Sequence, residues 1–192
     1  FSIITMSLFP LFFSVIDSMI LIVFTNLVAV TFIVVRYYKH IQFKLLIIPV
    51  ILSLITTYIG LINLIEIDND IIIKGLGVLL ILLAVYLFFF SNKVKVPANQ
   101  LTASIAGIIA GLMNGFFSIP GPPVVLYYSS AIGYKRQYIA TVQFLFLTSS
   151  ILKIGFFSTQ YGVNAELINL LPFSILAAVL GSASSAVFSS GA

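Results

Sequence analysis

Lys153 is the residue in this sequence whose type and position best suit the binding of an anion. It follows fifteen residues of the apolar stretch that begins at Tyr138, and Gln143 and Ser150 lie on one helix face that Lys153 flanks. A cation at membrane depth is by default a functional hypothesis, and here it would attract a negatively charged ligand. The alternative is that the Lys153 stem carries its charge out to the lipid headgroups.

A second signal is the sequence SIPGPP at residues 118–123, through which no continuous helix runs. A break at membrane depth frees backbone N–H and C=O groups, which are tolerated only inside protein or beside a watery cavity. A half-helix starting near Pro122 would direct its positive dipole end and unpaired N–H groups at that cavity, which suits an anion. Asn114 and Ser118 would hydrogen-bond the ligand across the break, or else satisfy the freed backbone.

Small residues at four-residue spacing lead up to this break, and they are Gly107, Gly111 and Gly115. Such a face allows close packing of helices. The whole Gly and Pro cluster therefore has two interpretations: a substrate site at a broken helix, or a kinked helix packed tightly against its neighbours. The density of the cluster favours the site.

The composition shows what kind of element must carry these residues. Hydrophobic residues make up 61% of the 192 residues, charged residues 7%, and the mean hydropathy is +1.22, whereas about 25% of residues are charged in soluble proteins. Several apolar runs reach the length of about 20 residues that crosses a bilayer. We predict an all-α integral membrane protein, a polytopic helical bundle with crossings at 19–35, 45–65, 71–90, 138–157 and 167–187.

The same composition argues against other classes of protein. There is no cysteine, and one histidine with five acidic residues leaves little for a metal site. The nine basic residues are scattered and form no patch for nucleic acid. No nucleophile or acid–base constellation is evident inside the membrane, so we expect no enzyme, no cofactor and no metal, with the lipid bilayer as partner.

Loop charges predict the topology of the segment 101–131, which is too long for one straight crossing. It either crosses once as a broken helix or enters and returns as a re-entrant pair of half-helices. Basic residues at 36–44 and 91–100 place these loops in the cytoplasm by the positive-inside rule, and acidic residues lie between them at 66–70. Only the re-entrant alternative also places the basic loop 132–137 in the cytoplasm. We expect a multi-pass protein of the cell membrane.

A faint internal repeat agrees with the re-entrant topology. A shift of 117 positions pairs Asn26 with Gln143 and Arg36 with Lys153. The chain would then be a single transmembrane domain, 1–192, with a first repeat at 1–91 whose amino-terminal part we expect to be missing, and a second repeat at 101–192. The two repeats would run in opposite directions, as the inverted repeats of secondary transporters do.

Residues 107–130, GIIAGLMNGFFSIPGPPVVLYYSS, resemble the TauE/SafE sulfite exporter family, in which a similar run of spaced glycines ends in Gly-Ile-Gly-Gly-Pro. The stretch from Pro10 to Arg36-Tyr37 is similar to the first half of that family, and Ser150-Ile-Leu-Lys153 is similar to its Asn-x-x-Lys. Two departures stand out. The glycine-rich end is Ser118-Ile-Pro-Gly-Pro122 here, and Ser150 replaces the asparagine.

The resemblance implies a transporter built from two repeats that moves sulfur oxyanions such as sulfite, thiosulfate or organosulfonates, or else small carboxylates. We expect transport by alternating access. It implies substrate roles for the residues that match its motifs. Together with the residues singled out above, the candidate substrate-binding set is Gly111, Asn114, Gly115, Ser118, Gly121, Pro122, Gln143 and Lys153. A non-transporting membrane subunit or assembly factor is the alternative, and a homodimer stays open.

Overall fold

A computed structural model describes residues 2–89 and 96–161, and every regular element in that part is helical. The elements are α1 (Ser2–Leu8), the 3-10 turn η1 (Phe9–Leu11), α2 (Val15–Tyr37), the 3-10 turn η2 (Tyr38–His40), α3 (Phe43–Glu66), α4 (Asn69–Phe89), α5 (Gln100–Phe117), α6 (Gly121–Ala131) and α7 (Lys135–Gln160). Five of these helices, α2, α3, α4, α5 and α7, are long and apolar enough to cross a membrane.

The predicted fold class is confirmed as an all-α polytopic membrane protein. The predicted crossings 19–35, 45–65 and 138–157 lie inside α2, α3 and α7, and 71–90 corresponds to α4. α2, α3 and α7 extend a few residues beyond the predicted crossings at both ends, whereas α4 begins two residues earlier than predicted and is described as far as Phe89. The predicted crossing 167–187 and the basic residues at 93 and 95 lie outside the described residues.

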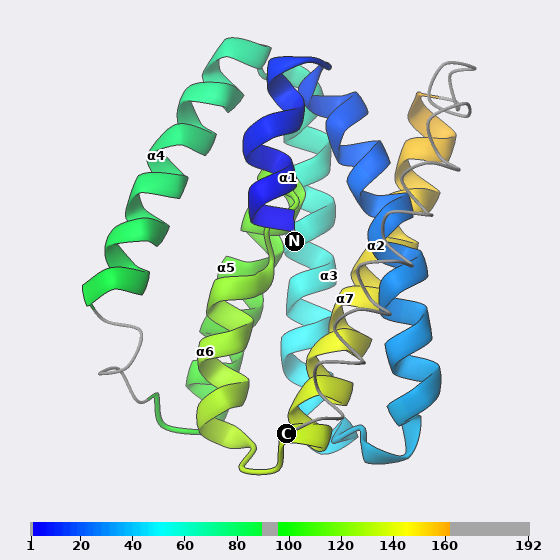
Figure 1. The fold of residues 1–192 in the computed structure, drawn as a ribbon, viewed down its shortest axis with the longest axis vertical. Helices are drawn as coiled ribbons and strands as arrows, with labels where there is room; N and C mark the ends of the chain where they lie inside the picture. Colours follow the sequence, from blue (N-terminus) through cyan, green and yellow to red (C-terminus); the bar gives the residue numbers. More distant parts are fainter. Residues whose placement is uncertain (1, 90–95, 162–192) are drawn as a thin grey trace, which may run out of the picture.

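The segment 101–131 forms two helices that enter and leave the bundle at the same end. In Figure 1, α5 begins and α6 ends at the lower end, and the break between them lies inside the bundle. The connections α2–α3 and α6–α7 also lie at the lower end, with Arg36, Lys39, Lys135 and Arg136, whereas the acidic α3–α4 connection lies at the upper end. The arrangement is that of the re-entrant alternative.

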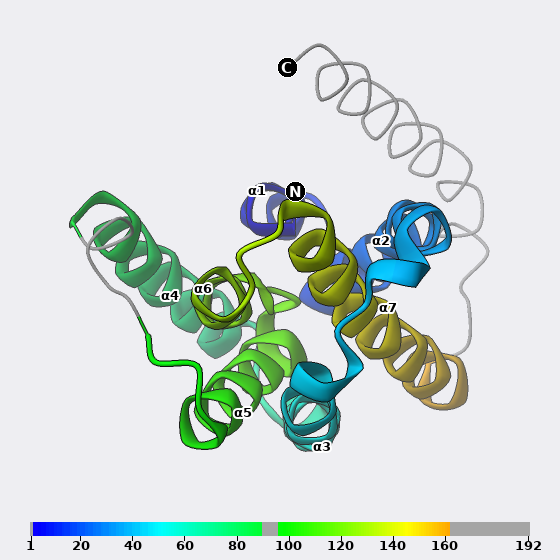
Figure 2. The same ribbon diagram turned by 90° about the horizontal axis from the view of Figure 1, so that it is seen from below.

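Two helix pairs form most of the bundle, as the view from below shows (Figure 2). α3 packs along α5, and α2 packs along α7. α2 runs from the upper to the lower end and α7 runs the other way. α1 begins near mid-height and leads up to α2, while α4 stands apart from the other helices on one side.

The α3–α5 pair is in backbone contact because α5 presents glycines to it. A Cβ added to Gly107 would lie 2.9 Å from the Cα of Pro49, and one added to Gly111 would lie 2.9 Å from the Cα of Ser53 and would also overlap the Thr56 side chain. One added to Gly115 would lie 2.9 Å from the Cα of Gly60. Only glycine fits at these three positions.

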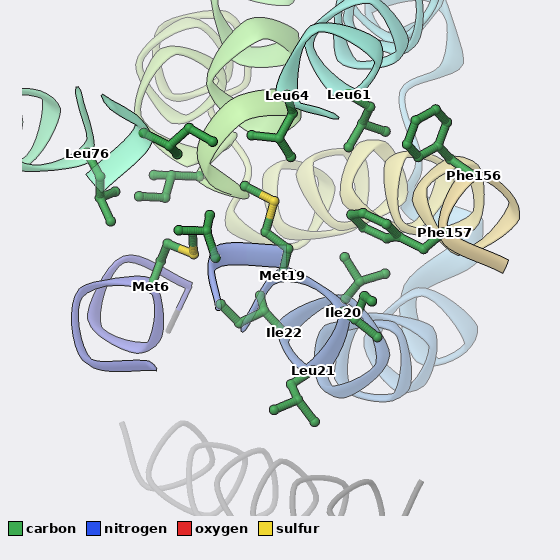
Figure 3. Close-up of a cluster of buried hydrophobic side chains, with 14 of the residues drawn as sticks. Met6, Met19, Ile20, Leu21, Ile22, Leu61, Leu64, Leu76, Phe156 and Phe157 are labelled. Atoms are coloured by element: carbon green, nitrogen blue, oxygen red, sulfur yellow. The ribbon is translucent and has the colours of Figure 1, made fainter. Parts of the chain in front are cut away.

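Two clusters of buried apolar side chains fill the bundle at different heights. The upper cluster contains Met6 from α1, side chains from the first turns of α2, and Leu61, Leu64, Leu76, Phe156 and Phe157, which point toward one another in Figure 3. The lower cluster joins α5, α6 and α7 through Ala103, Ala106, Ala110, Val124, Tyr127, Tyr128, Val142 and Leu145. Polar side chains gather between the two clusters.

Candidate functional site

Lys153 is buried in the bundle, with 2% of its side chain exposed. Its ammonium Nζ donates a hydrogen bond to the hydroxyl Oγ of Ser118 at 2.7 Å, which ties α7 to the break between α5 and α6. Among residues 2–89 and 96–161, no carboxylate forms a salt bridge with it. The snorkelling alternative is wrong for this structure, because the ammonium group points into the bundle.

Ser118 holds the acceptor of this bond in a left-handed backbone conformation, with φ 56° and ψ 28°. It ends α5, and its N–H donates to the carbonyl of Asn114 at 3.0 Å, which is the pattern of a left-handed helix cap. A side chain in this conformation costs about 1 kcal/mol relative to glycine. The strained cap places the Ser118 hydroxyl against Lys153.

A small cavity lies beside this hydrogen bond, between α2, α7 and the end of α5. Its volume is about 10 Å³, about the space that one water molecule needs. Polar side chains dominate its lining, and the lining residues are Ile22, Val23, Asn26, Asn114, Ser118, Pro120, Phe146, Ser149, Ser150 and Lys153. A ligand larger than water would need the walls of this cavity to move apart.

Ser149 contributes a hydroxyl that has no hydrogen-bond partner. The side chain is 2% exposed, and its Oγ is unpartnered. A buried hydroxyl is seldom left in this state, because the lost hydrogen bond costs about 1–3 kcal/mol. Since Ser149 lines the cavity, a bound ligand can supply the missing partner.

Asn26 and Ser149 were not singled out as site residues by the sequence. Ser149 precedes Lys153 by one helical turn, so helical periodicity alone would have placed it on the same face. Asn26 comes from α2 and reaches the cavity only because α2 packs along α7. Its one signal in the sequence was its pairing with Gln143 in the internal repeat.

Asn114 connects the cavity to the α3–α5 pair. Its side-chain Nδ2 donates to the Thr57 hydroxyl at 3.4 Å, and that hydroxyl donates to the carbonyl of Gly111 at 3.1 Å. Asn114 is itself buried, with 4% exposed. Its amide is therefore both a lining group of the cavity and part of the bonding between α3 and α5.

Of the eight predicted site residues, the structure brings Asn114, Ser118 and Lys153 together at the cavity. Gly111 and Gly115 face α3 instead, where they allow backbone contact. Gly121 and Pro122 line a separate, mostly apolar hollow of about 260 Å³, together with Ile3 and Tyr86. Gln143 is half-buried on α7 and is not among the residues that line the cavity.

The start of α6 offers an anion fewer N–H donors than a helix terminus normally does. Pro120, Pro122 and Pro123 carry no N–H, so only Gly121 supplies one among the cap and the first three helical residues. The helix dipole is still present there. The expected row of backbone N–H donors is thus mostly absent, and hydrogen bonds to an anion must come mainly from side chains.

A comparison with protein families matches residues 1–191 to the family described as Sulfite exporter TauE/SafE. The chain belongs to the TauE/SafE family. The predicted family is confirmed, and membership in it implies a membrane transporter. Comparisons with curated proteins and with solved structures found no match.

In this TauE/SafE protein, a cluster of buried apolar side chains lies on each side of the cavity along the bundle. Along α7, Val142 and Leu145 belong to the lower cluster, and Phe156 and Phe157 belong to the upper cluster. The α7 residues that line the cavity lie between these two pairs, and they are Phe146, Ser149, Ser150 and Lys153. The cavity therefore lies between the two clusters.

Proposed function

We propose that this TauE/SafE protein transports small sulfur oxyanions, such as sulfite or organosulfonates, and binds them at the cavity between α2, α7 and the break. The buried Lys153 ammonium, hydrogen-bonded to Ser118 and beside the unpartnered hydroxyl of Ser149, carries the proposal.

The chemistry of the lining favours an anion. A buried ammonium that lacks a carboxylate partner is costly, and a bound anion compensates its charge. The Ser149 hydroxyl and the amides of Asn26 and Asn114 can donate hydrogen bonds to oxygens of the ligand. A cation would meet Lys153 without a counter-charge in the described part of the lining.

Alternating access is the mechanism that we propose, with the two apolar clusters acting as gates. The opposite directions of α2 and α7 support a pair of inverted repeats at 1–91 and 101–192. The α3–α5 pair, held by backbone contact, would move as one body while α2 and α7 shift against it. The basic lower end would face the cytoplasm, as the positive-inside rule requires.

The test is transport in proteoliposomes that contain the purified protein. We expect uptake of sulfite or methanesulfonate above protein-free vesicles, and loss of that uptake in Lys153→Ala. Lys74→Ala, which removes an exposed lysine from α4, is the matched control and should transport normally. Absence of uptake by a folded wild-type protein, for any sulfur oxyanion, would overturn the proposal in favour of a non-transporting subunit.

A further inference from the structure

The charge inventory of the cavity is unusually simple. Among the described residues that line the cavity, Lys153 is the one ionisable side chain, and the remaining polar groups are two amides and three hydroxyls. The other cations of the described segments, such as Arg36, Lys44 and Lys135, are exposed near helix ends. A ligand at this site therefore meets at most one full positive charge from the described lining side chains.

We infer that the site selects singly charged oxyanions, such as sulfonates or hydrogensulfite, over doubly charged ones, such as sulfate or thiosulfate. This inference rests on the proposed function and adds the charge of the substrate to it. It follows from the count of cations around the cavity, together with the scarcity of N–H donors at the start of α6.

The physical reason is compensation of charge in a site that excludes water. A monoanion next to Lys153 leaves a neutral pair, and the neutral donors complete its hydrogen bonds. A dianion leaves one negative charge without a counter-charge between two apolar clusters, where charge is poorly solvated. The dipole of α6 supplies only about half a charge, so it does not replace a second cation.

Methanesulfonate and sulfate separate the two cases, since both carry four substituents on a tetrahedral sulfur and they differ in charge. We would measure the thermal stability of the full-length protein in detergent with sodium methanesulfonate, sulfate, thiosulfate or chloride at matched ionic strength. We expect methanesulfonate to bind at least about tenfold more tightly than sulfate or thiosulfate.

Asn26→Lys provides a gain-of-function test. Asn26 lines the cavity and is half-buried, so a lysine there adds a second cation beside the ligand. We expect the variant to be less stable without ligand, and its preference to shift toward sulfate by about tenfold. Gln143→Lys is the matched control, because Gln143 is equally half-buried on α7 but does not line the cavity.

The outcomes separate the two proposals. If sulfate binds as tightly as methanesulfonate in the wild type, charge selection is wrong while the anion site stands. If no oxyanion stabilises the protein more than chloride does, the proposed function itself fails. If Asn26→Lys does not fold, the order of anion affinities in the wild type decides alone. If Asn26→Lys and Gln143→Lys shift the anion preference equally, the cavity is not the origin of the selectivity.

Discussion

The α5 helix makes two contrasting contacts, one with α3 and one with α7. Its glycine face touches the α3 backbone, and no cavity residue comes from α3. Its carboxyl end carries Asn114 and Ser118. This end lies next to the buried ammonium of Lys153 and the unpartnered hydroxyl of Ser149, both on α7. The first contact leaves no space between the two backbones, and the second contact borders a cavity with a buried cation.

The contrast indicates that the two sides of α5 have different roles. Close backbone packing fixes α5 on α3, so the break is held at a defined depth. A buried hydroxyl without a partner occurs on both sides, Ser53 on α3 and Ser149 on α7. Only the α7 side adds a buried cation beside a cavity, which is expected where a ligand binds. Substitutions on the two sides should therefore differ in kind: loss of fold on one side, loss of ligand on the other.

The largest effect is expected for Gly111→Ala. The added methyl would overlap α3, with the Ser53 Cα only 2.9 Å away, so we expect a loss of about 3 kcal/mol or more in stability, because backbone atoms must shift. Thermal unfolding in detergent measures it. The control is Gly77→Ala on α4, which meets no atom within 4 Å and should be neutral or slightly stabilising. Equal stability of the two variants would contradict the tight α3–α5 contact.

Lys153→Ala should weaken ligand binding and leave stability almost unchanged, the reverse of Gly111→Ala. It removes the buried cation, so we expect the affinity for methanesulfonate to fall by about 2 kcal/mol or more, roughly thirtyfold. Stability without ligand should change little, because the cost of burying the charge disappears with it. Titration calorimetry and thermal unfolding check the two parts. Unfolding of this variant with unchanged ligand affinity in the folded fraction would assign Lys153 a structural role.

Two variants separate the effects of the Ser118 backbone conformation and of the Ser118 side chain on stability. Ser118→Ala loses the bond to Lys153 and keeps the left-handed strain, so we expect it to lose about 1.5 kcal/mol. Ser118→Gly loses the same bond but relieves the strain, and it should be about 1 kcal/mol more stable than Ser118→Ala. Chemical or thermal unfolding of both variants measures the difference. Identical stabilities would mean that the φ of 56° costs nothing here.

The smallest effect on stability is expected for Ser149→Ala. This change removes a buried hydroxyl that has no partner, so stability should be unchanged or raised by up to about 1 kcal/mol. Methanesulfonate binding should weaken by about 1 kcal/mol, roughly fivefold, if the ligand uses this hydroxyl. A clear loss of stability in the ligand-free protein would show that the hydroxyl has a structural partner instead.

The sequence predicts the helices and the break well, because both depend on local signals. Long apolar runs specify crossings, and the prolines at 120, 122 and 123 end a helix whatever surrounds them. The loop charges were enough to predict that 101–131 returns to its starting side, since Lys135 and Arg136 lie with the other basic residues at the lower end.

The site could be predicted only in part, because it depends on which helices meet. Lys153 and Ser118 each stand out by residue type. Spaced glycines such as Gly111 and Gly115 are typical both of close helix packing and of a ligand site, so the sequence does not distinguish the two roles. Asn26 is a neutral residue on a distant helix, and only the packing of α2 along α7 brings it to Lys153. Gln143 shares a helix face with Ser150, which predicts a site residue, but it is not among the residues that line the cavity.

The most direct test of the anion site uses the absence of cysteine from the sequence. Ser149→Cys introduces a single thiol into the cavity, and its labelling by N-ethylmaleimide in membranes can be timed with methanesulfonate or an equal concentration of chloride. We predict slow labelling that methanesulfonate slows further and chloride does not, while Gly155→Cys on the same helix is unaffected by either. A thiol at 149 that is never labelled, or one that is labelled at the same rate with both anions, would contradict an anion site between the two apolar clusters.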